Sequence, residues 1–256
     1  MAKICCTSYS LRNHLVGGEM TLKGFVELCG DLGMEGVELL NKHFLETGEG
    51  YLRQLRESAD SLGLEIASVN ASNNFAVPDR EKLEEQVAHV KKWVQVASRL
   101  GAPVVRVFTG HIAEGLDYGS LVPRAIEGFR KIAQYAENYG VTLGVENHGN
   151  FCNRADEVLK IVEEVGSSRL KTFPDTGNFL ENRYEQLEKV APLAVHVHAK
   201  MYAFDEEGEE TTIDYRRVAQ IFQRVHYKGY FSIEYGGKGD QMAGVKKGLA
   251  LLRRCL

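Results

Sequence analysis

Residues 141–150, VTLGVENHGN, begin with a short β-rich run, Thr142–Glu146, and end in polar residues and glycine. Runs of this kind are typical of buried strands that lead into a turn. Seven further runs of four or five residues, mostly Val, Ile, Leu, Phe or Thr, share the form: Ile4–Ser8, Gly36–Leu40, Glu65–Val69, Val104–Phe108, Leu170–Phe173, Ala194–His198 and Tyr230–Glu234. The sequence therefore predicts eight strands.

Segments with helical periodicity lie between these runs. Asp79–Leu100 is the strongest, because its apolar residues recur every three or four positions between a turn at Pro78 and the stop at Gly101. The other segments are Thr21–Leu32, Ser120–Tyr139, Ala155–Val165, Ile213–Val225 and Gly244–Leu252. The chain thus alternates strand and helix.

The spacing of the runs favours a closed barrel. The predicted strands begin about every 32 residues, the length that one strand, one helix and two short loops require between parallel strands. Eight such units make a (β/α)8 TIM barrel of about 250 residues, and here they fill residues 1–256 as a single domain. An open doubly wound sheet has the same alternation, but no GxGxxG or GxxxxGK[ST] follows a predicted strand.

Composition limits the classes of partner. Thirty-one Lys and Arg against 35 Asp and Glu give a net charge of −4, which offers no electrostatic footprint for nucleic acid. No apolar run approaches the roughly 18–20 residues that cross a bilayer, and the first one ends by Thr7, too early for a signal peptide. Five scattered cysteines without a metal-type CxxC predict a reduced, cytoplasmic protein, with Cys5 and Cys6 in the core of the first strand.

Active sites of such barrels lie at the carboxyl ends of the strands. Side chains alternate across a strand, so Glu146 and His148 share one face of VTLGVENHGN. In LAVHVHAKMY, His196, His198 and Lys200 share a face, and the valines opposite belong against the helices. We therefore expect the polar face of each strand to point into the barrel.

The other two strands of this half end in carboxylates. Glu234 shares a face with Ser232 in YFSIEYGG, and Asp175 follows the sixth strand in PDTGN. Three carboxylates brought together would repel and raise each other's pKa unless a cation offset them. A single glutamate or histidine has a structural alternative, an ion pair, a loop cap or a hydrogen-bonded core position, but four on consecutive strands predict a metal site.

The predicted ligands are Glu146, Asp175, His198 and Glu234. Three carboxylates and one imidazole suit one divalent metal ion, namely Mn²⁺, Mg²⁺, Co²⁺ or Fe²⁺, and Zn²⁺ is possible.

The strings VENHG, PDTGNF, VHVHAK and SIEY, in this order, resemble the xylose isomerase-like TIM-barrel superfamily. GVELL and LGAPVVRVFTG extend the resemblance over nearly the whole chain. Members include sugar isomerases, ketose 3-epimerases, inosose and dehydroshikimate dehydratases and DNA repair enzymes of the endonuclease IV type. The resemblance implies the same four ligands, with the second His of HxH as the imidazole, and relatives that are often dimers or tetramers.

Three differences from the patterns of individual family members reduce the number of activities that the resemblance implies. Asn178 stands where the trinuclear zinc endonucleases have a His ligand, which argues against DNA repair. His148 stands where xylose isomerases proper have a Lys, which puts two-metal aldose isomerisation in doubt. The chain is also short for a ketose 3-epimerase, so we expect reduced loops around the substrate.

The lead hypothesis is a sugar isomerase or epimerase that moves a proton at the carbon next to a carbonyl. Glu146 and Glu234 are the predicted acid and base as well as ligands, because two carboxylates on opposite sides of a substrate can remove and return a proton. A metal-dependent dehydratase of the inosose or dehydroshikimate type begins with the same step. A sugar-binding barrel without catalysis and metal-assisted hydrolysis are remoter alternatives.

The predicted substrate contacts are His148, Lys200, Glu38, Arg106, Asn70 and His111. For Lys200 and Arg106 an ion pair with a carboxylate is the structural alternative, and for Glu38 a loop cap. His196 and Asn178 are placed behind the ligands, which they would orient. Only Gly236–Gly239 is a possible phosphate loop, so a non-phosphorylated sugar is favoured.

Overall fold

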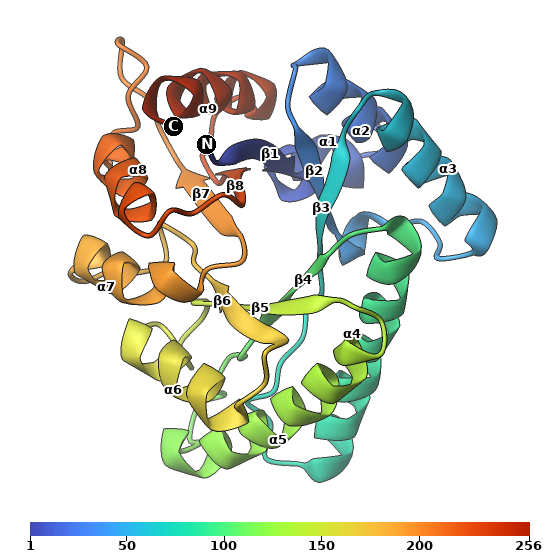
Figure 1. Cartoon of the computed structure of the whole chain (residues 1–256), viewed down its shortest axis with the longest axis vertical. Helices are drawn as coiled ribbons and strands as arrows, with labels where there is room; N and C mark the ends of the chain where they lie inside the picture. Colours follow the sequence, from blue (N-terminus) through green and yellow to red (C-terminus); the bar gives the residue numbers. More distant parts are fainter.

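Eight parallel strands form the centre of the structure, a computed structural model that describes residues 1–256 (Figure 1). They are β1 (Lys3–Thr7), β2 (Gly36–Leu40), β3 (Glu65–Asn70), β4 (Val104–Phe108), β5 (Thr142–Glu146), β6 (Leu170–Phe173), β7 (Val197–Met201) and β8 (Tyr230–Tyr235). The sheet order is β6-β5-β4-β3-β2-β1-β8-β7. Its two ends meet through the parallel bridges Thr172–Ala194 and Asp175–His198, which close the barrel. The predicted TIM barrel is confirmed.

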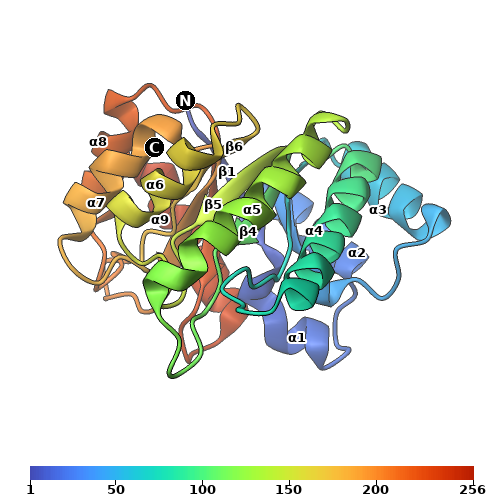
Figure 2. The same ribbon diagram turned by 90° about the horizontal axis from the view of Figure 1, so that it is seen from below.

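Helices surround the strands and follow them along the chain (Figure 1). They are α1 (Arg12–Val16), α2 (Leu22–Asp31), α3 (Glu49–Ser61), α4 (Arg80–Leu100), α5 (Tyr118–Glu137), α6 (Ala155–Val165), α7 (Arg183–Val190), α8 (Tyr215–Arg224) and α9 (Gln241–Cys255). Short 3-10 helices are η1 (Ser8–Leu11), η2 (Asn41–His43) and η3 (Ala191–Leu193). The long helices α4 and α5 pack side by side, and the two ends of the chain lie close together (Figure 2).

The helix starts follow capping chemistry that the sequence contains. Asp79 accepts hydrogen bonds from the amides of Glu81 and Lys82 at the start of α4, and Gly101 ends that helix in the left-handed conformation. The predicted segment Asp79–Leu100 is therefore confirmed, with Asp79 as its cap.

The seventh strand begins later than the predicted run Ala194–His198. The Ala194 amide donates to the Ala191 carbonyl and ends η3, so regular pairing with β8 starts only at Val197. As a result Lys200 lies within β7, opposite Glu234 of β8.

Three helices, α1, α3 and α7, lie outside the predicted segments, and α1 has only five residues and no buried side chain. In α3 the buried residues are Leu52, Leu55, Ser58 and Ala59, and in α7 the buried residues are Leu187 and Val190. In α3 the residues Leu52, Leu55 and Ala59 recur at spacings of three and four, so periodicity could have found this helix. In α7 only two apolar residues are buried, and packing against α6 and α8 stabilises it.

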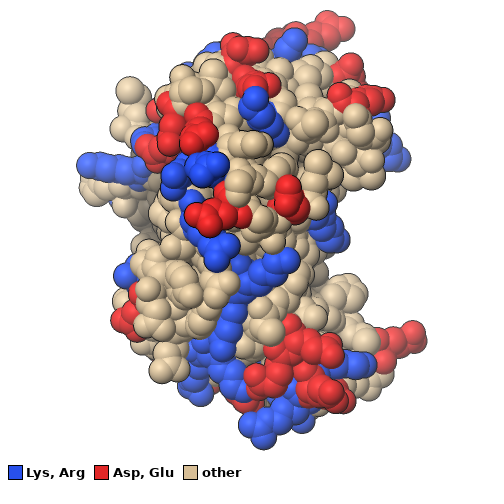
Figure 3. All heavy atoms as spheres, turned by 90° about the vertical axis from the view of Figure 1, so that its right-hand side faces the viewer, with Lys and Arg blue, Asp and Glu red and all other residues tan.

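The outer faces of the strands pack against the helices, as Val107, Val145 and Val197 do, each fully buried in the main core. The helices cover the barrel, and the face drawn in Figure 3 has acidic and basic side chains interspersed over it. None of the helices combines the length and apolarity that crossing a bilayer requires.

Candidate metal centre

The four predicted ligands converge at one end of the barrel. Glu146 ends β5, Asp175 follows β6, His198 lies in β7 and Glu234 in β8. One potential ligand atom from each lies within 4.8 Å of the others, and all four residues are buried. The structure thus brings together side chains from four consecutive strand units.

His198 Nδ1 lies at the centre of this group. It is 2.9 Å from Glu234 Oε2 and 3.4 Å from Glu146 Oε1. It is 3.8 Å from Asp175 Oδ2. Although His198 Nδ1 and Glu234 Oε2 lie close to each other, neither buried atom makes a hydrogen bond, which is unusual for polar atoms. Nitrogen and oxygen atoms that converge in this way can serve as the ligands of a divalent metal ion.

The turn after β6 aims the Asp175 carboxylate. Its Oδ1 accepts hydrogen bonds from the amides of Gly177 (2.7 Å) and Asn178 (3.1 Å), which leaves Oδ2 directed at the cluster. Asn147 holds the main chain at this point, because its Oδ1 accepts from the Asp175 amide and its Nδ2 donates to the Asp175 carbonyl. Sequence reasoning missed Asn147, which alternation places on the face opposite Glu146.

Lys200 forms ion pairs with two carboxylates, the structural alternative to its predicted contact with substrate. Its Nζ is 2.7 Å from Glu234 Oε1 and 3.3 Å from Asp175 Oδ2. A Cβ at Gly177 would lie 2.5 Å from Lys200 Cγ, so the glycine of PDTGN leaves the space that this side chain fills. Burial lowers the pKa of Lys200, but the two carboxylates raise it more, and the amine stays charged.

Arg106 is also in an ion pair, with Nε 3.1 Å from Glu146 Oε2. Its guanidinium lies 3.8 Å from the centre of the Phe108 ring, and Phe108 stacks on His148 with ring centres 4.1 Å apart. Asn178 Nδ2 donates to Glu146 Oε1 at 3.3 Å, which agrees with its predicted position behind a ligand. Glu146 is therefore held from two sides.

The charges of the cluster depend on burial and on close partners. Burial raises the pKa of Glu146 and of Glu234, but nearby cations outweigh it: Arg106 and His198 for Glu146, His198 and Lys200 for Glu234. Burial raises the pKa of Asp175 to about 7, because Lys200 offsets only part of the effect and the other two carboxylates add to it. This is the repulsion that a divalent cation would relieve.

Glu38 lies beneath the cavity rather than in its wall. It is fully buried, and its Oε1 is 2.7 Å from His198 Nε2 while its Oε2 is 2.8 Å from His196 Nε2. The expected direct contact of Glu38 with substrate is therefore corrected, because histidines surround the carboxylate. His196 faces the other oxygen of the same carboxylate, and its role in orienting a ligand stays a prediction.

A cavity of about 410 Å³ opens above the cluster. Of the predicted site residues, its walls include Asn70, Arg106, Glu146, His148, His198, Lys200 and Glu234. His111 does not line it and is exposed in the loop after β4, so its predicted contact with substrate is also corrected.

Several residues of the wall were not singled out from the sequence: Thr7, Tyr9, Arg12, Val16, Leu40, Lys42, His43, Ser72 and Phe108. Most lie in or just after β1 and β2, where SYSLRNH and NKH carry polar and aromatic residues at strand ends. The rule that placed the last four strands at the site applies equally to these two strands.

Comparison with known proteins gives one family and several distant relatives. A model described as "Xylose isomerase-like TIM barrel" matches residues 26–255. A 3'-dehydrocarminate deglycosidase alpha subunit from Microbacterium sp is 21% identical, over 93% of this chain and 89% of the relative. A D-psicose 3-epimerase from Agrobacterium fabrum is 23% identical, over 68% of this chain and 65% of the relative.

Among solved structures, a 3-keto-D-glucoside 4-epimerase from E. coli superposes with a TM-score of 0.81 and 14% identity, over 100% of both chains. Identity at this level establishes the shared fold alone.

Proposed function

Because the chain belongs to the xylose isomerase-like TIM barrel family, we propose that it is a divalent-metal-dependent isomerase or epimerase of a sugar or sugar derivative. The observation that carries the proposal is the convergence of four buried side chains, three carboxylates and one imidazole, whose potential ligand atoms lie within 4.8 Å of one another beside an open cavity.

Glu146, Asp175, His198 and Glu234 would hold the ion. A divalent ion bound there supplies Lewis acidity, which stabilises the negative charge that forms when a proton leaves the carbon next to a carbonyl. Mn²⁺, Mg²⁺, Co²⁺ and Zn²⁺ all accept this set of oxygen and nitrogen donors.

Glu146 and Glu234 are the proposed bases and acids. Both line the cavity, so each can face the carbon of a bound sugar that loses or regains a proton. Arg106 and Lys200, which also line the cavity, form ion pairs with the two carboxylates. Burial lowers the pKa of His148, so its neutral ring can accept or donate a hydrogen bond at a substrate hydroxyl.

The substitution Glu234→Gln tests this assignment while keeping the shape of the side chain. The wild-type protein, loaded with a divalent metal ion, is incubated in D2O with a panel of keto- and aldo-sugars. NMR then follows the replacement of hydrogen by deuterium at the sugar carbons. We expect exchange next to the carbonyl in the wild type and a loss of about 10²-fold or more in the variant. The exposed Glu207→Gln is the matched control. Full exchange activity in Glu234→Gln with its fold intact would refute the proposal.

A lyase that uses the same site is the second candidate. β-Elimination starts with the same proton removal, and a relative that aligns over 93% of the chain is a deglycosidase subunit, a name that indicates the loss of a sugar substituent. Mass spectrometry separates the two reactions. A product with the mass of the substrate indicates isomerisation or epimerisation, and loss of water or of a glycosidic substituent indicates elimination.

A non-phosphorylated substrate is part of the proposal. Gly236–Gly239 lie at a separate cavity beside Tyr202 and Phe204, next to the start of α9. There Asp240 accepts a hydrogen bond from the Ala243 amide, so a carboxylate already occupies the position that a phosphate would take. Assembly into dimers or tetramers stays a prediction from the family resemblance.

A further inference from the structure

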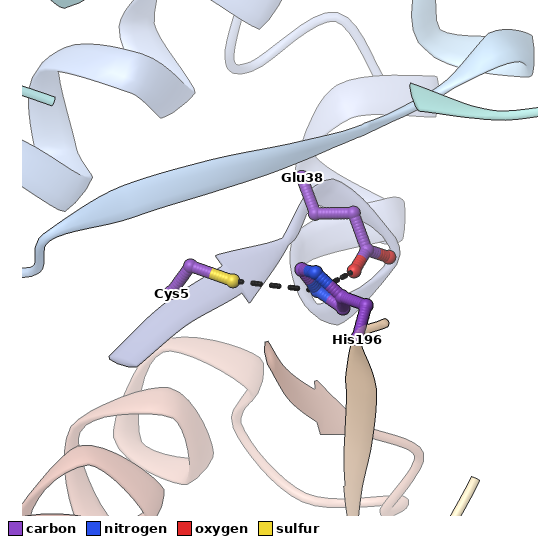
Figure 4. Close-up of side chains that lie close together, drawn as sticks. All are labelled: Cys5, Glu38 and His196. Atoms are coloured by element: carbon purple, nitrogen blue, oxygen red, sulfur yellow. Dashed lines mark hydrogen bonds and ion pairs between the residues drawn. The ribbon is translucent and has the colours of Figure 1, made fainter. Parts of the chain in front are cut away.

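We propose that Glu38 is a positioning residue for the metal centre: it holds the proton of His198 on Nε2, so that Nδ1 is the atom that faces the ion. The inference rests on the proposed metal-dependent function and assigns a role to a carboxylate that touches neither ion nor substrate. Figure 4 shows Glu38 of β2 beside His196 and Cys5.

The two ring nitrogens of His198 face opposite surroundings. Nδ1 faces Glu234, Glu146 and Asp175, while Nε2 is 2.7 Å from Glu38 Oε1. A metal-bound imidazole keeps one proton, and that proton stays on the nitrogen that has an acceptor. Glu38 is that acceptor, so it fixes both the proton position and the rotation of the ring.

Glu38 is itself fixed by a short chain of hydrogen bonds. Asn70 Nδ2 donates to Glu38 Oε1, and Ser68 Oγ donates to Asn70 Oδ1 at 3.3 Å, which orients the amide. Ser68 and Asn70 belong to β3, which pairs directly with β2. The carboxylate is fully buried, so water does not compete for its oxygens.

Phe173 fixes the planes of both histidine rings. Its ring stacks on His196 with centres 4.7 Å apart and meets His198 edge-on at the same distance. Each carboxylate oxygen of Glu38 faces one of these two rings.

Cys5, Glu38 and His196 also form a second group of potential metal ligands. However, both oxygens of Glu38 already face histidine nitrogens, and burial raises the pKa of the Cys5 thiol, which disfavours the thiolate form that binds metals. Cys5 Sγ is 3.7 Å from His196 Nε2, at hydrogen-bond distance for sulfur. The group therefore supports the metal centre from below and holds no ion of its own.

Titration of the ion-free protein with Co²⁺, by calorimetry and visible absorption, tests the proposal without substrate. We expect one ion per wild-type chain and a dissociation constant about 10- to 100-fold higher in Glu38→Ala. Glu38→Gln keeps an oxygen that can accept from His198 and should lose less. Glu65→Gln, which removes an exposed carboxylate, is the matched control and should bind as the wild type does.

A second measurement excludes a general loss of structure. In the Co²⁺ protein, proton NMR should show one strongly shifted, slowly exchanging imidazole N–H, from His198 Nε2. It should exchange faster in Glu38→Ala and be retained in Glu38→Gln, provided that circular dichroism shows both variants folded.

The outcomes are distinct. If the wild-type protein binds no divalent ion, the proposed function itself is refuted. Wild-type affinity and slow N–H exchange in Glu38→Ala overturn only the role of Glu38. Two ions per wild-type chain, one of which Cys5→Ala removes, would make the lower group a metal site and overturn the proposal as well.

Discussion

Single residues of the cluster differ in charge because their neighbours differ. Glu146 and Asp175 are both buried carboxylates, and burial raises the pKa of each. Arg106, 3.1 Å away, brings the pKa of Glu146 below its usual value. The pKa of Asp175 rises to about 7, because Lys200 offsets only part of its burial. Residue type alone would have given both carboxylates the same charge at neutral pH.

His43 gives a pH-dependent prediction at this scale. Burial, and then the charge of Lys42, lower its pKa to about 4, and its Nδ1 lies 2.9 Å from Ser8 Oγ. The unfolded chain takes up a proton near pH 6.5 and the folded chain only near pH 4, so acidification through this window destabilises the fold.

Urea unfolding at pH 7 and pH 5 checks this for the wild type and for His43→Asn. The wild type should lose about 1 kcal/mol more than the variant, roughly half the full linkage value because the ring is partly exposed. An NMR titration of His43 gives its pKa directly. Equal losses in the two proteins, or a pKa near 6.5, would contradict the prediction.

At the scale of elements, glycines without a Cβ leave room for side chains of the site. Gly144 of β5 lies against Phe173, the residue that packs on both histidines, and a Cβ there would be 2.7 Å from Phe173 Cδ2. The run TLGVE therefore needs its glycine for close approach between neighbouring strands, as PDTGN does for Lys200.

Gly144→Ala should destabilise the protein by about 1–3 kcal/mol, because the added methyl group forces Phe173 out of its packed position. It should also weaken metal binding, since Phe173 fixes the ring of His198. Denaturant unfolding and Co²⁺ titration measure the two effects. Gly50→Ala is the control, because Gly50 lies in α3 with nothing near its Cβ position, and alanine there should stabilise slightly. Equal stabilities of the two variants would show that Phe173 moves aside without loss of stability and would contradict the prediction.

At the scale of the whole molecule, the barrel has one weak seam. All neighbouring strands pair over at least two consecutive residues except β6 and β7, which meet through isolated bridges; the pairing of β2 with β3 shifts register between Val37 and Glu38. Three backbone hydrogen bonds cross there, from the amides of Val195, His198 and Thr176. The proposed ligands come from β5, the turn after β6, β7 and β8, so a bound ion would join both sides of this seam.

Addition of Mn²⁺ or Co²⁺ should therefore raise Tm by about 5–10 °C at 100 times Kd. Amide exchange should slow most at Val195 and His198, on the seam. EDTA should reverse both effects, and His198→Ala should abolish them. A rise in Tm without protection of the seam would place the ion elsewhere.

The sequence by itself determined the TIM barrel and the four proposed ligands, because both follow from local patterns: strand–helix alternation, side-chain alternation and polar residues at strand ends. These patterns repeat within a few residues and need no knowledge of distant contacts. Helix α7 was missed because packing rather than local periodicity stabilises it, whereas α3 was missed although Leu52, Leu55 and Ala59 have helical spacing.

Only the tertiary structure decided what each polar group touches. Glu38 and His198 are 160 residues apart in the chain, and closure of the barrel brings Oε1 and Nε2 to 2.7 Å. The same closure pairs Arg106 with Glu146 and leaves His111 outside the cavity. Side-chain alternation gives the face on which a residue lies, but its neighbours across the barrel depend on how the eight strands are staggered around the axis.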